Sequence, residues 1–596
     1  MIKVGVTTGL YYIARAEELA TSLKKIGYAL SKGANAIEIS GDTPHEIDYT
    51  LGEEIRHLAE KQGIDLCFHG SLTTPFEIPE RSDWRDAHEH VLKSIRSAVF
   101  SGCKYVLFHA CLHYWLEMIT FTSSKLEIIM CDFDGRFISE ILHDDKRLRK
   151  WFSQKMWDYE RQYVQHILKA EEIEEGQGRA HSEVRLWETK EQRRRMNEIV
   201  EKNPELKLPE NRGKYDKIEE DILKTVGAEA AQKQGRLYRQ YLSDWAEKKM
   251  AKPTLEEREW KINNYGKMTD CYDIIAHYMF YNKDPIWLAM VEVYKDVLAP
   301  YKIDYTDDWW VDKAWRRAQD TNDRQFKEFW YAAMGAKYLE GHMKAALEYL
   351  NSGLLTYIKN LNIPESDKPK LIEIAKKLKI TIEMPDARDP RYAGQYILWH
   401  PKQVYAAIKT IRRIVKTDRV FMTIDWEHIA GQGVDPILEI KKLKILAPDF
   451  GKFVLSVHSN APNPLHAHYP IELGDMEVYT LNYFLRETGF GKQAGYDVYL
   501  WFERGGGDDP FRQSVDALKL CAKFLERDVP PENLPEEYFG LKLTGLDFWR
   551  QEAIMRDHRF EPLKDLLEIP EEEWGLFSSA ATRKGKTKEF KKEELK

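Results

Sequence analysis

The stretch Tyr105-Val-Leu-Phe-His109 shows the pattern that decides the fold, because apolar and aromatic residues run directly into a polar one. A short apolar run of this kind, followed by a helical pattern, is typical of a strand buried on both faces of a parallel sheet. Seven further runs have the same form, at residues 3–8, 36–40, 64–69, 380–383, 420–425, 453–458 and 498–503.

The spacing of these eight runs indicates a barrel with one interruption. Successive run ends lie 32, 29, 40, 274, 42, 33 and 45 residues apart, and every interval except the fourth fits one strand–helix unit. Eight such units predict an α/β fold of the (β/α)8 TIM-barrel class. The helices are expected near residues 14–31, 50–62, 85–101, 367–378, 402–415 and 512–526.

The long interval predicts a domain inserted between the fourth and fifth strands. We expect barrel segments at 1–114 and 366–527, a mostly α-helical insertion at 115–365, and a C-terminal helical appendage with a basic tail at 528–596. Of 17 tryptophans, 11 lie between Trp115 and Trp330, so the composition changes within the insertion. Its polar stretch near 175–235 favours a long exposed helix or a partly mobile segment, and the insertion offers a surface for homo-oligomers.

Composition excludes several classes of protein. The net charge is −8 over 596 residues, which gives no broad basic footprint for nucleic acid. The six cysteines form no CxxC pair, which argues against a cysteine-rich zinc site or a disulfide framework. No apolar run is long enough to cross a membrane, and the N-terminus has no secretory signal pattern, so we expect a cytoplasmic protein without a membrane partner.

Polar residues at the ends of the predicted strands are the candidate site. In a TIM barrel these positions converge at the carboxyl mouth. Three further histidines lie close behind the sixth and seventh strands. The nine candidates are His69, His109, Glu383, Asp425, His428, His458, His466, His468 and Glu503. So many ionisable groups in one mouth need counter-charge, which predicts divalent cations, zinc first, with manganese, iron, cobalt or magnesium as options.

At these residues the sequence resembles the superfamily of xylose-isomerase-like TIM barrels, which includes endonuclease IV and the ketose epimerases. The resemblance covers residues 1–112 and 366–527. It is carried by Phe68-His69-Gly70, Phe108-His109, Ile382-Glu383, Asp425-Trp-Glu-His428, Val457-His458, His466-Ala-His468 and Trp501-Phe-Glu503.

The resemblance implies two alternative metal arrangements. In the endonuclease IV pattern up to three metals bind per chain, in groups that would be His69, His109 and Glu383; Glu383, Asp425, His458 and Glu503; and His428, His466 and His468. His466 departs from that pattern, which has Asp there. In the isomerase pattern one metal is held by Glu383, Asp425, His458 and Glu503, and the two glutamates act as an acid–base pair.

Three functions therefore remain open. The first is hydrolysis of phosphate esters, with DNA among the substrates and Glu383, Asp425 and Glu503 as catalytic groups. The second is a sugar or sugar-phosphate isomerase or epimerase. The third is a scaffold role on a drifted barrel. The loops after His69 and His109 differ from those of the nuclease. Four residues are expected to contact a phosphate- or sugar-containing substrate: Arg388, Arg504, Gly505 and Gly506.

Overall fold

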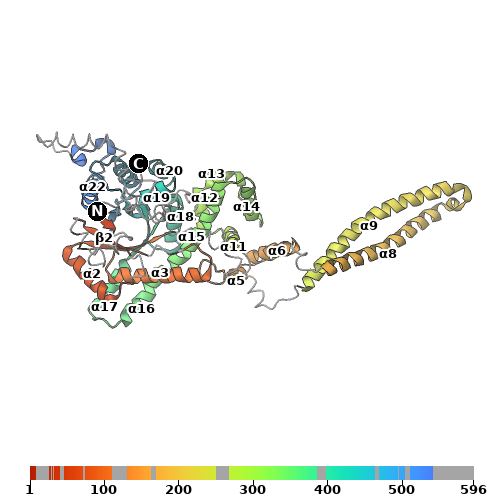
Figure 1. Ribbon diagram of the computed structural model, residues 1–596, viewed down its shortest axis with the longest axis horizontal. Coiled ribbons are helices and arrows are strands. Elements are labelled where there is room, and N and C mark those ends of the chain that lie inside the picture. The colour runs from red at the N-terminus through yellow and green to blue at the C-terminus, as the bar shows by residue number, and fades with distance from the viewer. Residues whose placement is uncertain are drawn as a thin grey trace, which may run out of the picture. The chain divides into compact units, whose positions relative to one another are not determined.

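The computed structural model describes residues 1–7, 26–27, 30, 33–40, 46–70, 74, 76–110, 130–162, 170–249, 268–385, 397–462, 469–493, 495–503 and 510–540. Eight parallel strands close into a barrel in chain order (Figure 1). They are β1 (Ile2–Thr7), β2 (Ala36–Ser40), β3 (Asp65–His69), β4 (Tyr105–His109), β5 (Lys379–Glu383), β6 (Val420–Asp425), β7 (Val454–His458) and β8 (Val498–Phe502). The predicted fold class is confirmed, and each predicted strand end lies within one residue of the observed one.

Helices follow the strands as a (β/α)8 barrel requires. They are α2 (Tyr49–Gln62), α3 (Arg81–Phe100), α17 (Asp367–Lys377), α18 (Pro401–Val415), α19 (Trp426–Gly431), α20 (Pro436–Leu446), α21 (Met476–Glu487) and α22 (Pro510–Glu526). Local sequence sets their ends. Asp48 caps the first turn of α2, and Gly63 ends that helix with a φ of +63°, a conformation that glycine adopts without strain. The helix expected at 14–31 lies largely outside the described residues.

The described part of the insertion after β4 is mostly helical, and it also contains two isolated antiparallel bridges, Glu80–Met130 to the chain before α3 and Cys131–Phe137 within the insertion. The Cys131–Phe137 bridge lies where a hairpin turn at Asp134-Gly135 brings the chain back, with a φ of +74° at Gly135. The insertion helices are α5 (Ile138–Asp144), α6 (Lys146–Gln162), α8 (Ala170–Lys202), α9 (Arg212–Lys249), α11 (Met268–Tyr281), α12 (Pro285–Val293), α13 (Lys295–Leu298), α14 (Trp310–Asp320), α15 (Arg324–Glu348) and α16 (Leu354–Asn360).

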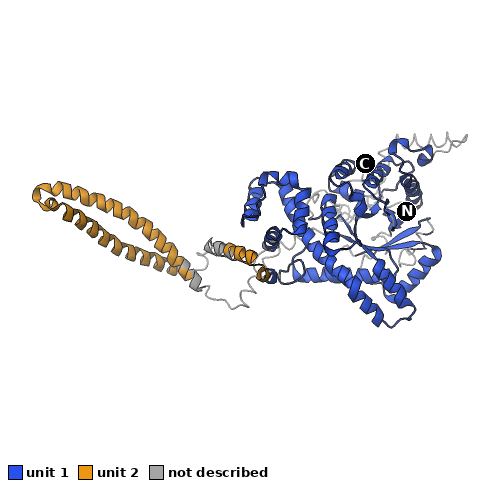
Figure 2. Cartoon of the chain, turned by 180° about the vertical axis from the view of Figure 1, so that it is seen from behind, with its two compact units in different colours: residues 1–141, 263–596 blue, residues 142–262 orange. Residues whose placement is uncertain are grey.

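The chain forms two compact units (Figure 2). The first comprises Met1–Ile141 and Asn263–Lys596, and it contains the whole barrel; the second is Leu142–Ile262. The second unit is thus shorter than the predicted insertion of 115–365, because α11 to α16 are part of the barrel unit. A buried hydrogen bond of 2.6 Å from Gln403 Nε2 to the Tyr294 hydroxyl, for example, joins α18 to the end of α12.

The second unit contains a long helical hairpin, with α8 and α9 side by side (Figure 1). The two helices run antiparallel. Gln177, early in α8, bonds to Tyr238, late in α9, whereas Arg195, further along α8, pairs with Glu229, which comes earlier in α9. Met196, Val200, Ile222 and Val226 form its buried core. The polar stretch predicted as a long exposed helix is therefore two helices that bury one narrow apolar seam between them.

Buried side chains from most of the eight strands form one hydrophobic cluster in the barrel. The cluster comprises Ala36, Cys67, Tyr105, Leu107, Phe421, Leu455, Tyr499 and Trp501. This packing closes the barrel below its mouth, so chemistry is confined to the strand ends. Within the described part of the chain, no helix is long and apolar enough to cross a membrane. After α22 the described chain adds two short 3-10 turns, Pro531–Asn533 and Glu536–Phe539.

Candidate metal centre

The sheet register brings the ends of neighbouring strands together at the mouth. His109 on β4 pairs with Glu383 on β5, although 274 residues separate them in the sequence. Asp425 on β6 likewise pairs with His458 on β7. Because residues two apart on a strand share a face, His69, His109 and Asp425 lie on the same face as Cys67, Leu107 and Phe421 of the packed core.

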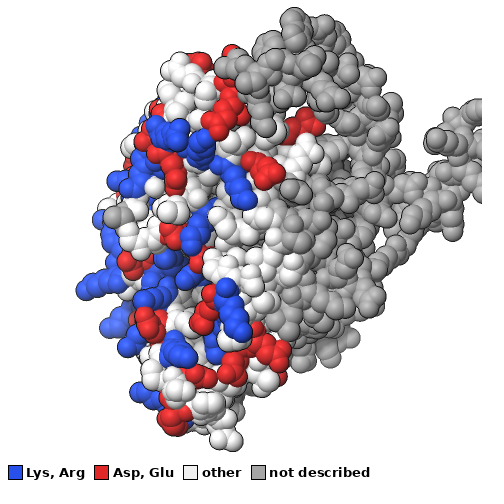
Figure 3. Space-filling model, turned by 90° about the vertical axis from the view of Figure 1, so that its left-hand side faces the viewer, with Lys and Arg blue, Asp and Glu red and all other residues white. Residues whose placement is uncertain are grey.

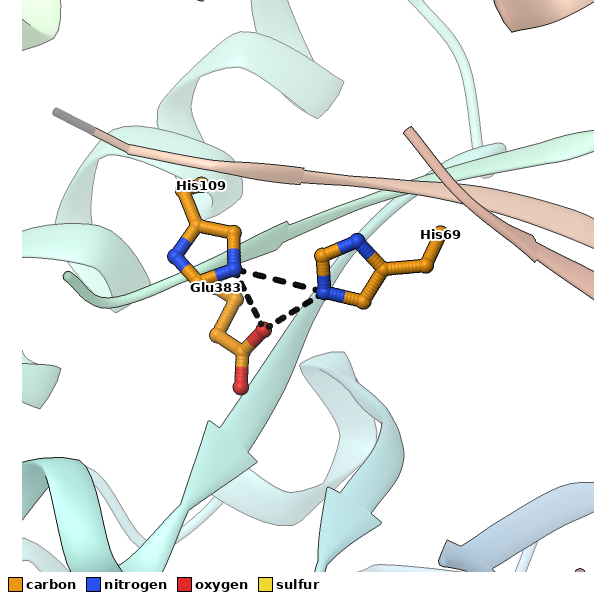
Figure 4. Close-up of side chains that lie close together, drawn as sticks. All are labelled: His69, His109 and Glu383. Atoms are coloured by element: carbon orange, nitrogen blue, oxygen red, sulfur yellow. Dashed lines mark hydrogen bonds and ion pairs between the residues drawn. The ribbon is translucent and has the colours of Figure 1, made fainter. Parts of the chain in front are cut away.

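The first cluster joins His69, His109 and Glu383 (Figure 4). Glu383 Oε2 lies 3.4 Å from His109 Nε2 and 3.8 Å from His69 Nε2, and the two Nε2 atoms are 3.3 Å apart. His69 Nδ1 is 3.0 Å from the carbonyl oxygen of Gly70. A carbonyl only accepts, so Nδ1 carries the proton and the lone pair of Nε2 faces the cluster.

The second cluster is centred on His458. Its Nδ1 lies 2.8 Å from Glu383 Oε1 and 3.6 Å from both Asp425 Oδ2 and Glu503 Oε2. Glu383, Asp425 and His458 are fully buried, whereas the Glu503 side chain is 20% exposed. Burial favours a neutral His458, but the carboxylates of Glu383, Asp425 and Glu38 outweigh it and raise the pKa of His458 well above its usual value.

The third cluster consists of Asp425, His428 and Glu503. Asp425 Oδ1 caps α19 by accepting hydrogen bonds from the backbone N–H of Glu427 and His428, at 2.6 and 3.0 Å. This leaves Oδ2 for the mouth, 3.6 Å from His428 Nε2. His428 Nδ1 lies 2.8 Å from the Met384 carbonyl, which places the proton on Nδ1. Burial opposes ionisation of Asp425, but His428 and His458 hold its pKa well below the usual range.

Four buried atoms at this centre test whether the site fits a cation. Both carboxylate oxygens of Glu383, Oδ2 of Asp425 and Nδ1 of His458 have no hydrogen bond of acceptable geometry among the described residues. Buried polar atoms are normally satisfied, and acidic acceptors that face one another repel. Divalent cations with imidazole and carboxylate ligands would satisfy all four atoms at once, and the donor set suits zinc, manganese or iron.

The structure thus brings together seven of the nine predicted ligands. His466 and His468 lie outside the described residues, as do the four predicted substrate contacts, Arg388, Arg504, Gly505 and Gly506. The grouping of His428 with His466 and His468 stays a prediction. Among the described residues His428 lies instead with Asp425 and Glu503, a grouping that the sequence did not suggest.

Two supporting residues were missed in the sequence. Glu38 is fully buried and lies 3.2 Å from His458 Nε2. Asn460 clamps the backbone of Glu503, since its Oδ1 accepts from Glu503 N at 2.9 Å and its Nδ2 donates to Glu503 O at 3.0 Å. A signal for Glu38 was present, because an acidic residue inside the apolar run 36–40 needs a partner.

Comparisons with known proteins add little to this picture. No protein-family model and no curated protein matches the chain. One solved structure that is similar is described as "Structure of L-ribulose 3-epimerase". The likeness covers 88% of this chain and 96% of that one, with 9% sequence identity and a TM-score of 0.34. A score this low does not establish a common fold, so the fold class rests on the closed parallel barrel itself.

Proposed function

We propose that this protein is a divalent-metal-dependent TIM-barrel enzyme that hydrolyses phosphate esters with a multinuclear metal centre. The observation that carries the proposal is the cluster of His69 and His109 on Glu383. A single-metal site on Glu383, Asp425, His458 and Glu503 would leave His69 and His109 as substrate contacts, whereas their Nε2 atoms both face the Glu383 carboxylate, as metal ligands would. Glu383 belongs to both the first and the second cluster, and Asp425 to both the second and the third. Adjacent cations would need shared ligands of this kind.

The protein's own residues determine what such a centre can do. Bound divalent cations would lower the pKa of water and neutralise the charge of a phosphate ester. Glu383 lies between two clusters and fixes their separation, while the Met384 and Gly70 carbonyls hold His428 and His69 in one tautomer. Glu503 is the most exposed ligand of the second cluster, so substrate approaches from its side.

Substrate charge would be met mainly at the mouth rather than on the outer surface. On the face in Figure 3 the side chains of Lys and Arg lie among those of Asp and Glu. Charges of the described residues are also paired on the surface, as in the ion pairs Lys377–Glu373 and Arg96–Glu46. Because basic side chains are mixed with acidic ones on this face, the surface does not single out an extended polyanion. DNA is therefore only one candidate among phosphate esters.

A sugar isomerase or epimerase is the second candidate. Glu383, Asp425 and His458 form one group of possible ligands, and Glu503 Oε2 lies 3.6 Å from His458 Nδ1, so a single-metal site would need neither His69 nor His109. In this mechanism Glu383 and Glu503 would hold and move the substrate proton on opposite faces of one carbon. The similar solved structure is also that of an epimerase, although its low TM-score gives that likeness no weight.

Metal content and turnover of one double variant separate the two candidates. His69→Ala with His109→Ala removes the first cluster and leaves the second intact. The matched control replaces two histidines that are exposed on helices, His57→Ala with His181→Ala. Metal per chain is measured by plasma mass spectrometry, and turnover with bis(p-nitrophenyl) phosphate, an abasic-site duplex and a panel of ketoses.

For the hydrolase, the double variant should lose about one metal per chain and fall below about a tenth of the phosphodiesterase rate, whereas the control keeps both. An unchanged metal content together with ketose turnover would instead establish the isomerase. A wild-type chain that binds no metal would exclude both candidates and leave the scaffold alternative.

A further inference from the structure

A buried acidic residue lies beneath the metal centre, on the side of His458 that faces away from the cluster. Glu38 is the middle residue of β2, and its side chain is fully buried in the barrel interior. Its Oε1 lies 3.2 Å from His458 Nε2, and its Oε2 accepts a hydrogen bond from the Tyr105 hydroxyl. Glu38 belongs to none of the three ligand clusters.

Burial of an acid here is costly, so the partners of Glu38 determine its state. Each of its two carboxylate oxygens has a partner inside the barrel, His458 Nε2 for Oε1 and the Tyr105 hydroxyl for Oε2. A carboxylate accepts hydrogen bonds and donates none. Glu38 Oε1 therefore fixes a proton on His458 Nε2, while Oε2 accepts separately from the Tyr105 hydroxyl.

A hydrogen-bonded row of hydroxyl groups lies one inward-facing position below the neighbouring ligands. Thr423 Oγ1 bonds to Thr381 Oγ1 at 2.7 Å and to Ser456 Oγ at 2.6 Å. These three residues precede Glu383, Asp425 and His458 by two positions on β5, β6 and β7, so they point inward directly below them. The base of the centre is thus a rigid polar layer, and Glu38 contributes its carboxylate.

We propose that Glu38 is a positioning residue that orients His458 for metal binding. With the proton held on Nε2, the lone pair of His458 Nδ1 points at Glu383, Asp425 and Glu503, where a cation would complete the second cluster. A carboxylate on the far side of a ligating imidazole also makes the ligand more basic. This inference rests on the proposed metal centre and applies equally to a hydrolase and to an isomerase.

The test measures binding of cobalt(II) alone to the full-length, metal-stripped protein. Titration calorimetry gives the dissociation constant, the visible spectrum of the cobalt-loaded protein reports the ligands, and far-ultraviolet circular dichroism verifies the fold. Glu38→Ala removes the acceptor, and Glu38→Gln keeps the shape but loses the charge. Tyr105→Phe is the matched control, since it removes the other partner of Glu38 and leaves the bond to His458.

We expect Glu38→Ala to weaken cobalt binding about 10–100-fold and to change the cobalt spectrum, with Glu38→Gln intermediate and Tyr105→Phe close to wild type. Wild-type affinity and spectrum in a folded Glu38→Ala variant would overturn the inference while leaving the metal centre standing. If Glu38→Ala does not fold, Glu38→Gln decides in the same way. A wild-type chain that fails to bind cobalt removes the metal centre itself.

Discussion

The buried histidine of α15 gives a prediction about acid stability. His342 is fully buried; its ring stacks on Trp84 at 4.8 Å and meets the edge of Phe76 at 5.2 Å. Neither ring nitrogen has a hydrogen-bond partner among the described residues. Burial, with a smaller effect from His88 on α3, lowers the pKa of His342 from 6.5 to about 3.

This depressed pKa makes the folded state lose stability in acid. Below pH 6.5 the unfolded chain takes up a proton at His342, whereas the folded chain stays neutral until about pH 3. Unfolding therefore binds a proton in this window, and the free energy of unfolding falls as the pH falls. The loss from this one group is negligible at pH 7.5 and about 2 kcal/mol at pH 5.

The variant His342→Leu removes the titrating group and fills the apolar site. Urea unfolding, followed by tryptophan fluorescence at pH 7.5 and pH 5.0, gives the change in stability for wild type and variant. Between pH 7.5 and pH 5.0 the free energy of unfolding should fall by about 2 kcal/mol more in wild type than in His342→Leu. All other titrating groups are shared by the two proteins, so their effects cancel in this difference. The exposed His57→Leu serves as control and should follow wild type. An equal loss in wild type and His342→Leu would refute the reasoning, since His342 would then be protonated as readily in the folded chain.

Three further predictions concern packing, a buried charge and metal. Gly341→Ala would place a Cβ 1.8 Å from the Phe133 carbonyl oxygen, so this variant should not be expressed in soluble form. Gly178→Ala is its control, because a Cβ there meets no atom within 4 Å. Thermal melts should show that Gly178→Ala stabilises the protein by about 0.5–1 kcal/mol, since alanine favours a helix more than glycine does. Lys337 lies 2.7 and 2.6 Å from two carboxylates of low exposure, so Lys337→Met should cost about 3–5 kcal/mol by denaturant titration, and an unchanged midpoint would contradict this. Removal of metal by a chelator should lower the melting temperature. Zinc added back at 100 times its dissociation constant should raise the free energy of unfolding by about 2.7 kcal/mol. An unchanged melting temperature after zinc is added back would count against the metal centre.

The barrel could be predicted from the sequence because its signal is local and repeated. Each strand is an apolar run that ends in a polar residue, and six of the eight run ends are also candidate ligands, as at His109 and Asp425. Fold and site therefore depend on the same residues. The domain boundaries were harder, since Trp287 and Trp330 of the insertion are fully buried within the barrel unit. A count of tryptophans shows that a core exists but not which unit it belongs to.

The supporting residues escaped prediction because their role depends on which residue faces them. Nothing in the sequence near Glu38 indicates His458, which lies 420 residues away. His428 could be recognised as a ligand, but its partner could not. A histidine three residues beyond a strand end reaches several carboxylates, and the cap that Asp425 forms on α19 determines which one it meets.

The position of the insertion explains how a chain interrupted so deeply keeps a single site. β4 and β5 are neighbours in the sheet, and five residue pairs from Tyr105–Lys379 to His109–Glu383 hold them in register. The ladder of hydrogen bonds, rather than the length of the connection, thus fixes the distance between His109 and Glu383. An insertion of any length is tolerated here as long as its two ends meet the register, because loop closure costs free energy only as the logarithm of loop length. The insertion leaves the barrel at the carboxyl end of β4, and the chain returns through α17 to the amino end of β5. His109, one of the two residues that distinguish the hydrolase from the isomerase, is therefore the last strand residue before the part of the chain that is unlike a simple barrel.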